Sequence, residues 1–255
     1  MSVVVDRPLY VLIVSLIVLW SCARAGTALA QRRGETSADA REDFAVVQAA
    51  TLTLLGLIIG FSFSMAVSRY DQRKAYEEEE ANAIGTEYLR ADLLPAADGT
   101  AVRALLVRYT DQRILFYSVR GNARLDQIGA DTAQLQSALW TAIRAPAAAQ
   151  PTPLSALVVS GMNDVLNAEG YTAAAWRNRI PVGAWVLMLF IGACCNGLIG
   201  YGKRVRRGRH AMLFVLPLVV SISFALIADV DSPRNGIIRV APQNMHALAR
   251  SLNGP

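Results

Sequence analysis

The sequence is poor in the residue types on which most catalytic and metal sites depend. It has 3 cysteines and 2 histidines in 255 residues. Three cysteines cannot form a disulfide framework, and neither histidine belongs to a metal-ligand or nucleophile spacing. The sequence contains no Walker loop and no GxGxxG, GxSxG or HExxH motif. We therefore expect a protein that is not an enzyme and that needs no metal and no cofactor.

Charged and aromatic residues are also scarce, at 18% and 7% of the chain. A nucleic-acid-binding domain usually carries a dense basic surface with interleaved aromatic residues. The net charge is only +5, and much of it comes from one stretch, 203–209. Nucleic acid is therefore not an expected partner. The chain is 53% hydrophobic, which is too apolar for a disordered protein.

The apolar residues are collected into four long stretches, at 9–30, 44–67, 181–201 and 211–228. The second and third contain no charged residue. A hydrocarbon core about 30 Å thick needs about 20 helical residues to cross it. The sequence thus predicts an all-α integral membrane protein with four transmembrane helices and membrane lipids as partners. We divide it into helices 1 and 2 (1–68), an extramembrane domain (69–180), helices 3 and 4 (181–228) and a C-terminal tail (229–255).

The first stretch has a second interpretation, as a secretory signal. Arg7 precedes the apolar run, and Ala28-Leu29-Ala30 has the small residues of a cleavage site. Asp6 cancels the charge of Arg7, which is atypical of a signal. We favour an uncleaved transmembrane helix, and the signal peptide stays as the alternative.

The polar region 69–180 shows a helical pattern throughout, with no alternating strand. The second span continues without a breaker to Leu94, which predicts one long helix ending before Pro95. Further helices are expected at about 99–119, 123–144 and 154–168. Three prolines indicate a loop at 145–153, and Gly170 indicates a helix end.

Polar residues just beyond the second span offer two functional interpretations. Glu77–Glu80 are four consecutive carboxylates, which point all round a helix and cannot converge on one ion. We interpret them as a solvated surface, with a cation or interface site as the alternative. For the neighbouring polar groups we favour intersubunit or interhelix hydrogen bonds and i,i+3 pairing, such as Glu87 with Arg90, over an ion-concentrating vestibule. The candidate vestibule or interface residues are Arg69, Arg73, Glu80, Asn82, Glu87, Arg90 and Asp92.

The second span carries a distinctive stripe. Thr53, Leu57 and Phe61 recur at i, i+4 and i+8 and therefore lie one above the other. Gly56 and Gly60 form a small-xxx-small pair that allows close helix packing. The stripe fits ordinary packing inside one bundle. It also fits an oligomer in which rings of Leu and Phe form a hydrophobic constriction on the axis.

These residues also carry a family resemblance. Residues 60–70, GFSFSMAVSRY, resemble the end of the second helix in bestrophin chloride channels. More closely, the chain resembles the bacterial bestrophin-like domain family, which is itself of unknown function. The matching stretches cover nearly the whole chain and lie at 69–73, 80–86, 88–95 and 229–240.

The resemblance implies a homopentamer in the bacterial inner membrane, with the second helix lining an anion pore and chloride as a permeant ion. The neck of that pore falls on Thr53, Leu57 and Phe61, although Thr53 is polar where the family is apolar. Eukaryotic bestrophins carry an acidic calcium clasp after the last helix, of which only Asp229 and Asp231 remain here. Calcium gating is therefore not expected. The alternative function is a non-conducting membrane scaffold or sensor whose helical domain binds a protein.

The membrane orientation has two conflicting indications. Basic residues in short loops face the cytosol, and 203–209 together with Arg32, Arg33 and Arg41 would place both short loops there. The resemblance implies the opposite orientation, with the extramembrane domain in the cytosol. Both orientations stay open.

Overall fold

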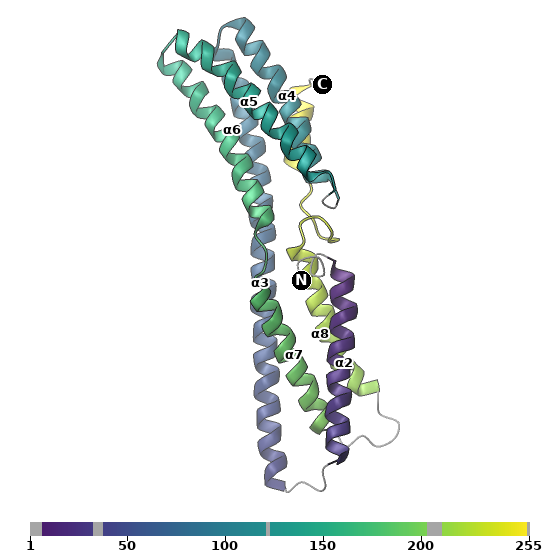
Figure 1. Ribbon diagram of the computed structural model, residues 1–255. Coiled ribbons are helices and arrows are strands. Elements are labelled where there is room, and N and C mark those ends of the chain that lie inside the picture. The colour runs from purple at the N-terminus through teal and green to yellow at the C-terminus, as the bar shows by residue number, and fades with distance from the viewer. Residues whose placement is uncertain (1–6, 33–37, 121–122, 203–210, 254–255) are drawn as a thin grey trace. The chain divides into compact units, whose positions relative to one another are not determined.

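The computed structural model describes residues 7–32, 38–120, 123–202 and 211–253, and these form helices without any strand. The stretch 203–209, on which one orientation depends, lies outside the described residues. The helices are α2 (Pro8–Arg32), α3 (Ala38–Arg90), the short 3-10 helix η1 (Ala91–Leu93), α4 (Ala96–Ser118), α5 (Leu125–Ala149), α6 (Pro153–Arg177), α7 (Val182–Gly202), α8 (Ala211–Asp231) and α9 (Gln243–Leu252) (Figure 1).

The predicted all-α membrane fold is confirmed. Four of the described helices are long and apolar enough to cross a membrane. Their apolar segments lie in α2, in the part of α3 before Ser68, in α7 and in α8. α3 has 53 residues and continues far beyond its apolar segment, as the absence of a breaker before Pro95 predicts. Carboxylates and guanidinium groups are costly in hydrocarbon, so we expect its charged second half to lie outside the membrane.

The chain divides into two compact units. The membrane unit comprises Met1–Arg69 and Arg179–Arg239, and the helical unit comprises Tyr70–Asn178 and Val240–Pro255. α3 therefore contributes residues to both. The tail that we expected at 229–255 is shared as well, since its first part belongs to the membrane unit and α9 to the helical unit.

The membrane unit depends on very close packing of α2 against α7. A Cβ atom on Gly26 would overlap the carbonyl oxygen of Gly197, and one on Gly200 would overlap that of Ala23. Small residues allow such backbone contact in membrane bundles, where dispersion and close packing replace the hydrophobic effect as the driving force. On α8, Phe214 meets the indole of Trp20 edge to face, with ring centroids 6.5 Å apart. Figure 1 shows α2, α7 and α8 lying side by side.

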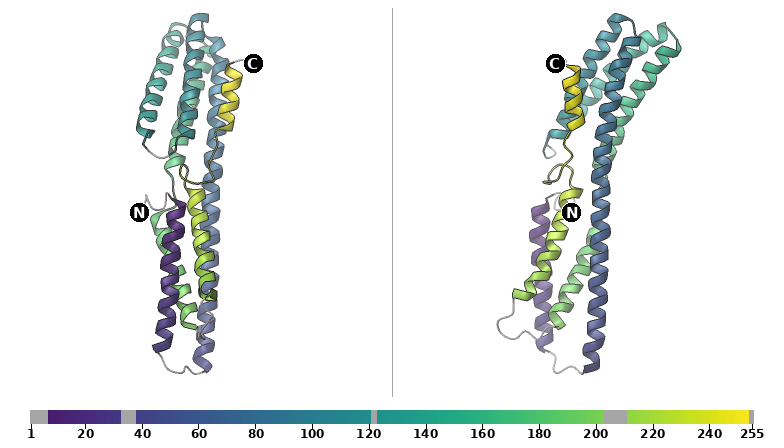
Figure 2. Two further views of the ribbon diagram at one scale, coloured as in Figure 1. Left: turned by 90° about the vertical axis from the view of Figure 1, so that its right-hand side faces the viewer. Right: turned by 180° about the vertical axis from the view of Figure 1, so that it is seen from behind.

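The helical unit is built around an apolar core supplied by α3, α4, α5, α6 and α9. Apolar residues recur at helical spacing on the inner face of each helix, which is why these amphipathic segments fold together. The fully buried members are Ile84, Ala91, Val102, Leu106, Tyr109, Leu139, Ile143, Val158, Met162, Val165 and Met245. Figure 2 shows α9, in yellow, lying along α3 and α4 to α6 lying next to one another.

Two expected helix ends were wrong. α5 continues through Pro146 to Ala149, so that the loop is shorter than 145–153. Pro146 lies in the last turn, where its missing N–H removes one hydrogen bond only. α6 continues through Gly170 to Arg177. A glycine inside a helix costs only about 1 kcal/mol, which packing of the other residues of α6 offsets.

Candidate functional site

The stripe of Thr53, Leu57 and Phe61 lies on the side of α3 that points away from the rest of the membrane unit. All three side chains are exposed, Leu57 by 52% and Phe61 by 63%. The buried residues of this segment are Leu55, Ser62 and Ala66. Because successive residues are 100° apart, these buried positions lie roughly opposite Leu57 around the helix. The stripe is therefore an apolar surface without cover from this chain's described residues.

The two glycines beside the stripe are equally open. A Cβ atom on Gly56 or Gly60 would find no atom of the described chain within 4 Å. The close approach that a small-xxx-small pair permits is thus not made to any described helix of the same chain. A contact at these glycines stays a prediction, and its partner would be another copy of the chain.

The inner side of the same segment holds α3 in the bundle. Cys195 on α7 donates its thiol hydrogen to the carbonyl oxygen of Thr51, with 3.2 Å between sulfur and oxygen. Further along, the ring of Phe44 packs at 5.4 Å from that of Tyr201. Cys195 therefore acts through packing and a hydrogen bond.

The four glutamates that we interpreted as a solvated surface are divided between two environments. Glu78 and Glu79 are exposed, as expected. Glu77 and Glu80 are buried, with 1% and 0% of their surface exposed. Residues three apart lie on one side of a helix, so both face the core of the helical unit. The solvated interpretation was wrong for these two residues.

Glu80 is the centre of a buried polar cluster. Arg113 of α4 donates hydrogen bonds from Nε and Nη2 to the two carboxylate oxygens. Tyr117 donates its phenol hydrogen to Oε2 at 2.7 Å, and Thr172 of α6 donates to the same oxygen at 3.1 Å. Burial and then the Glu80 charge raise the pKa of Tyr117 above its ordinary value. Burial alone would lower the pKa of Arg113, but its bonds to Glu80 raise it. Arg113 therefore stays charged and the phenol of Tyr117 stays protonated.

Glu77 binds the N-terminal end of α9. Its carboxylate accepts a hydrogen bond from the backbone nitrogen of Met245 at 2.9 Å and from the side-chain amide of Asn244 at 2.7 Å. The first N–H groups of a helix have no partner within it, and a negative charge there is favourable. Glu77 thus caps α9 from a distant helix and fixes it on α3.

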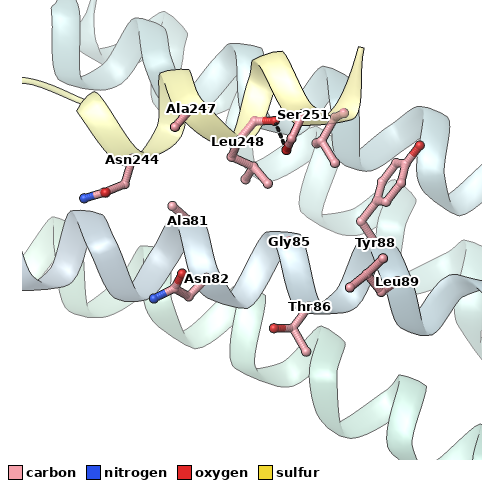
Figure 3. Close-up of a pocket in the computed structure, with 11 residues that line it drawn as sticks. Ala81, Asn82, Gly85, Thr86, Tyr88, Leu89, Asn244, Ala247, Leu248 and Ser251 are labelled. Atoms are coloured by element: carbon pink, nitrogen blue, oxygen red, sulfur yellow. Dashed lines mark hydrogen bonds between the residues drawn. The ribbon is translucent and has the colours of Figure 1, made fainter. Parts of the chain in front are cut away.

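A shallow groove of about 600 Å³ follows this contact between α3 and α9. Figure 3 shows Ala81 and Gly85 on one wall and Ala247 and Leu248 on the other, with Asn82 and Thr86 at the edge. The small residues on α3 let α9 approach closely, because a Cβ on Gly85 would lie 3.1 Å from a methyl carbon of Leu248. Asn82 is exposed at this edge.

Asp231, the last residue of α8, connects this helix to other parts of the membrane unit. Its carboxylate accepts the backbone N–H of Ile180 at 3.2 Å and lies 3.9 Å from Arg69 and 3.8 Å from Arg179. Nearby, the carboxylate of Asp229 accepts the backbone N–H groups of Ile237 and Ile238. Asp229 and Asp231 therefore bind groups of the chain itself.

Three more of the candidate vestibule residues have partners in the helical unit. Buried Arg73 donates hydrogen bonds to the carbonyl oxygens of Ala175 and Asn178, where α6 ends. Arg103 forms an ion pair with the exposed Asp92. Arg90 lies 4.0 Å from Asp164 of α6. A vestibule or interface role stays a proposal for this set of residues.

Glu87 is buried differently from the other glutamates. Its side chain has no exposed surface, yet neither carboxylate oxygen has a hydrogen-bond partner among the described residues. It lies under Gly161 of α6, where any Cβ atom would overlap the carboxylate and the guanidinium of Arg90. Burial raises the pKa of Glu87 to about 8, and nearby Arg90 opposes this rise. The carboxyl group therefore titrates near neutral pH.

Sequence reasoning missed the partners of Glu77 and Glu80, whereas for Glu87 it named Arg90, which acts on its charge. Arg113 was not singled out, although it is a charged residue in line with Tyr109 on the apolar side of α4. A charge at an otherwise apolar helical position predicts a buried ion pair, so this signal was present. Gly161 and Asp164 had no such signal. Among the described residues, no group of three or more His, Cys, Asp or Glu could hold a metal ion.

Comparisons with known proteins agree with the membrane fold. Among solved structures, a bacterial bestrophin homologue from Klebsiella pneumoniae, phased by zinc SAD, has a TM-score of 0.62 at 15% identity, covering 96% of both chains. A single-residue variant of that homologue gives 0.64 at 13% identity, covering 96% of this chain and 97% of that one. A structure described as a membrane protein variant gives 0.65 at 14% identity, covering 94% and 97%. Identity this low shows a shared fold alone.

No curated protein sequence matches this chain. The family model for the bestrophin-like domain, by contrast, matches residues 16–245. This range contains the exposed stripe of α3, the three buried glutamates and the two aspartates in the last turn of α8. The chain therefore belongs to the bestrophin-like domain family.

Proposed function

We propose that this protein is an oligomeric ion channel of the bacterial inner membrane, in which Thr53, Leu57 and Phe61 of α3 form the neck of the pore. The observation that carries the proposal is the exposure of this stripe on a helix that turns its opposite side to its own bundle. Copies arranged head to tail around a closed ring would bring one stripe from each chain to the axis. Leu and Phe rings at that position would gate by dewetting.

The same stripe would contact lipid if the chain acted as a scaffold or sensor without conduction. A transmembrane helix facing lipid also exposes apolar side chains. What favours the pore is the glycine pair beside the stripe, since Gly56 and Gly60 add nothing to lipid contact but allow a second helix to come close. Anions, with chloride as the first choice, are proposed as permeant ions, and five as the number of copies, from the bestrophin resemblance.

The test is ion flux into liposomes that contain the purified protein. Phe61→Ala and Leu57→Ala widen the proposed neck and should raise the flux above wild type. Phe63→Ala is the matched control, because Phe63 is an exposed aromatic residue of the same helix that lies off the stripe. Replacing chloride by a large anion should abolish the flux, whereas replacing potassium should not.

The mass of the protein in detergent must be measured on the same samples. A monomer cannot form this pore, so a monomeric mass would contradict the proposal. If wild type and both neck variants are oligomers but none of them passes ions, the channel proposal is refuted. The scaffold or sensor function would then be the remaining proposal. Equal flux in the Phe61 and Phe63 variants would refute the assigned neck.

A further inference from the structure

We propose that Glu87 is a proton-operated latch that controls how tightly α6 is held against α3. The inference is independent of conduction, since it concerns the helical unit alone. It starts from one arrangement of groups. A fully buried carboxyl without a hydrogen-bond partner lies under Gly161, next to an arginine that reaches across to α6.

The first step concerns the space that Glu87 occupies. Gly161 leaves room there because it has no Cβ atom, which would overlap the Glu87 carboxylate and the Arg90 guanidinium where these side chains now lie. α6 therefore covers the carboxyl with bare backbone and offers it no side-chain donor. An ionised carboxylate so enclosed loses its hydration without compensation, whereas the neutral acid loses much less. The closed arrangement thus requires the protonated form.

The second step concerns the charges around Glu87. Arg90 of α3 and Asp164 of α6 are the charged groups that act on it among the described residues, and η1 and α4 contribute none. Arg90 and Asp164 are 4.0 Å apart, and the aspartate side chain is 64% exposed. Water screens such an exposed pair, so it is weak. An ionised Glu87 in the interior would attract Arg90 more strongly than Asp164 does.

These two steps define the switch. With Glu87 protonated, Arg90 is available to Asp164 and links α3 to α6. When Glu87 releases its proton to water, Arg90 turns to the new carboxylate and the link to α6 is lost. The backbone over Gly161 must then loosen to admit solvent. The ordinary pKa of a glutamate is 4.5, but burial raises the pKa of Glu87 to about 8. The switch therefore works near neutral pH.

The test uses the full chain in detergent micelles and compares wild type with Glu87→Gln, which resembles the protonated acid at every pH. As the pH rises from about 6.5 to about 8 the wild-type unfolding midpoint should fall by roughly 5 °C and then level off, and that of Glu87→Gln should stay constant. Glu79→Gln is the control, since Glu79 is exposed on the same helix and should follow wild type. A wild-type slope that persists in Glu87→Gln would overturn the proposal.

Hydrogen exchange separates a latch from a merely buried acid. Amides of α6 around Gly161 should exchange several-fold faster in wild type than in Glu87→Gln at high pH, and equally at low pH. Asp164→Asn removes the partner of Arg90, so at low pH α6 should exchange somewhat faster than in wild type while Glu87 still titrates. If α6 exchanges alike in wild type and Glu87→Gln at high pH, there is no latch.

If the Glu87→Gln variant does not fold, infrared spectroscopy of wild type can test whether Glu87 is protonated at neutral pH. A protonated carboxylic acid has its own carbonyl stretch. A band that disappears when the pH rises through about 8 supports the proposal, since ordinary carboxyl groups are already ionised there. The absence of any such band at neutral pH would overturn it.

Discussion

The guanidinium of Arg113 and the carboxylate of Glu80 form an ion pair with 1% and 0% of their side-chain surfaces exposed. Arg113 also lies over the ring of Phe116, at 4.4 Å from its centroid, and 3.7 Å from the carboxylate of Glu169. The pair joins α3 to α4, and Thr172 extends it to α6. One polar cluster thus connects three helices across the core of the helical unit.

Removing one partner of this pair should destabilise the protein strongly. Arg113→Met leaves Glu80 as an uncompensated buried charge, which typically costs 3–5 kcal/mol, or about 4 kcal/mol here. Replacing both residues, as Arg113→Met with Glu80→Leu, should cost much less than the single change. Unfolding in denaturant measures both. Arg103→Ala breaks the exposed pair with Asp92 and should cost about 1 kcal/mol at most. An Arg113→Met variant as stable as Arg103→Ala would show that the pair is not buried in solution.

Glu77→Ala should release α9. The change removes the acceptor of the Met245 N–H and of the Asn244 amide and leaves the helix end without a cap. Loss of such bonds costs about 1–3 kcal/mol. Hydrogen exchange of residues 243–252 reports this release directly. Glu78→Ala is the matched control, because the neighbouring side chain is exposed, and its α9 should stay protected.

Substitution of glycine by alanine should lower the stability of the protein at a tightly packed glycine and raise it at a glycine with open space around it. Gly26→Ala places a methyl group into the backbone of α7, and relief of this overlap requires the helices to separate. We expect a loss of about 3 kcal/mol or more in unfolding experiments. Gly170→Ala meets no atom within 4 Å in the described chain and should stabilise α6 by about 0.5–1 kcal/mol. The reverse order of the two variants would mean that α2 and α7 are not in backbone contact.

The stability of the protein should fall as the pH rises from about 4.5 to about 8. Glu87 has a higher pKa in the folded state than in the unfolded state, so over this interval the folded state binds the additional proton. The unfolded state then releases its proton first, and the free energy of unfolding declines by about 1.4 kcal/mol per pH unit for this group. Above about pH 8 both states are ionised, and this contribution becomes constant. Denaturant titrations at several pH values measure the slope, and Glu87→Gln provides the baseline.

The membrane spans and the long α3 helix were predictable from sequence because each depends on local composition. An uncharged run such as 44–67 has one stable environment, and no residue before Pro95 can interrupt the helix that follows. The stripe of Thr53, Leu57 and Phe61 also follows from spacing alone. Its exposure does not, since spacing defines one side of a helix without showing what that side contacts.

The polar residues could not be assigned in this way. Glu77 and Glu80 belong to a run of glutamates that looks solvated in sequence. They are buried because of contacts with Met245 and Arg113, which lie 168 and 33 residues away along the chain. Glu87 depends on a glycine in α6 that no local pattern connects with it. Gly170 and Pro146 have strong local preferences that tertiary packing overrides. Short-range rules therefore located the helices, and long-range pairing determined the role of their polar groups.

The backbone contact between α2 and α7 has a genetic consequence. Every single-base change in a glycine codon that alters the residue adds at least a Cβ atom. At Gly26 and Gly200 each of these changes meets a carbonyl oxygen of the facing helix. We therefore expect single-base changes away from glycine at these two positions to destabilise the protein. A library of all single substitutions should contain no folded variant at Gly26 or Gly200. Folded variants at these positions should need a second substitution that moves α7.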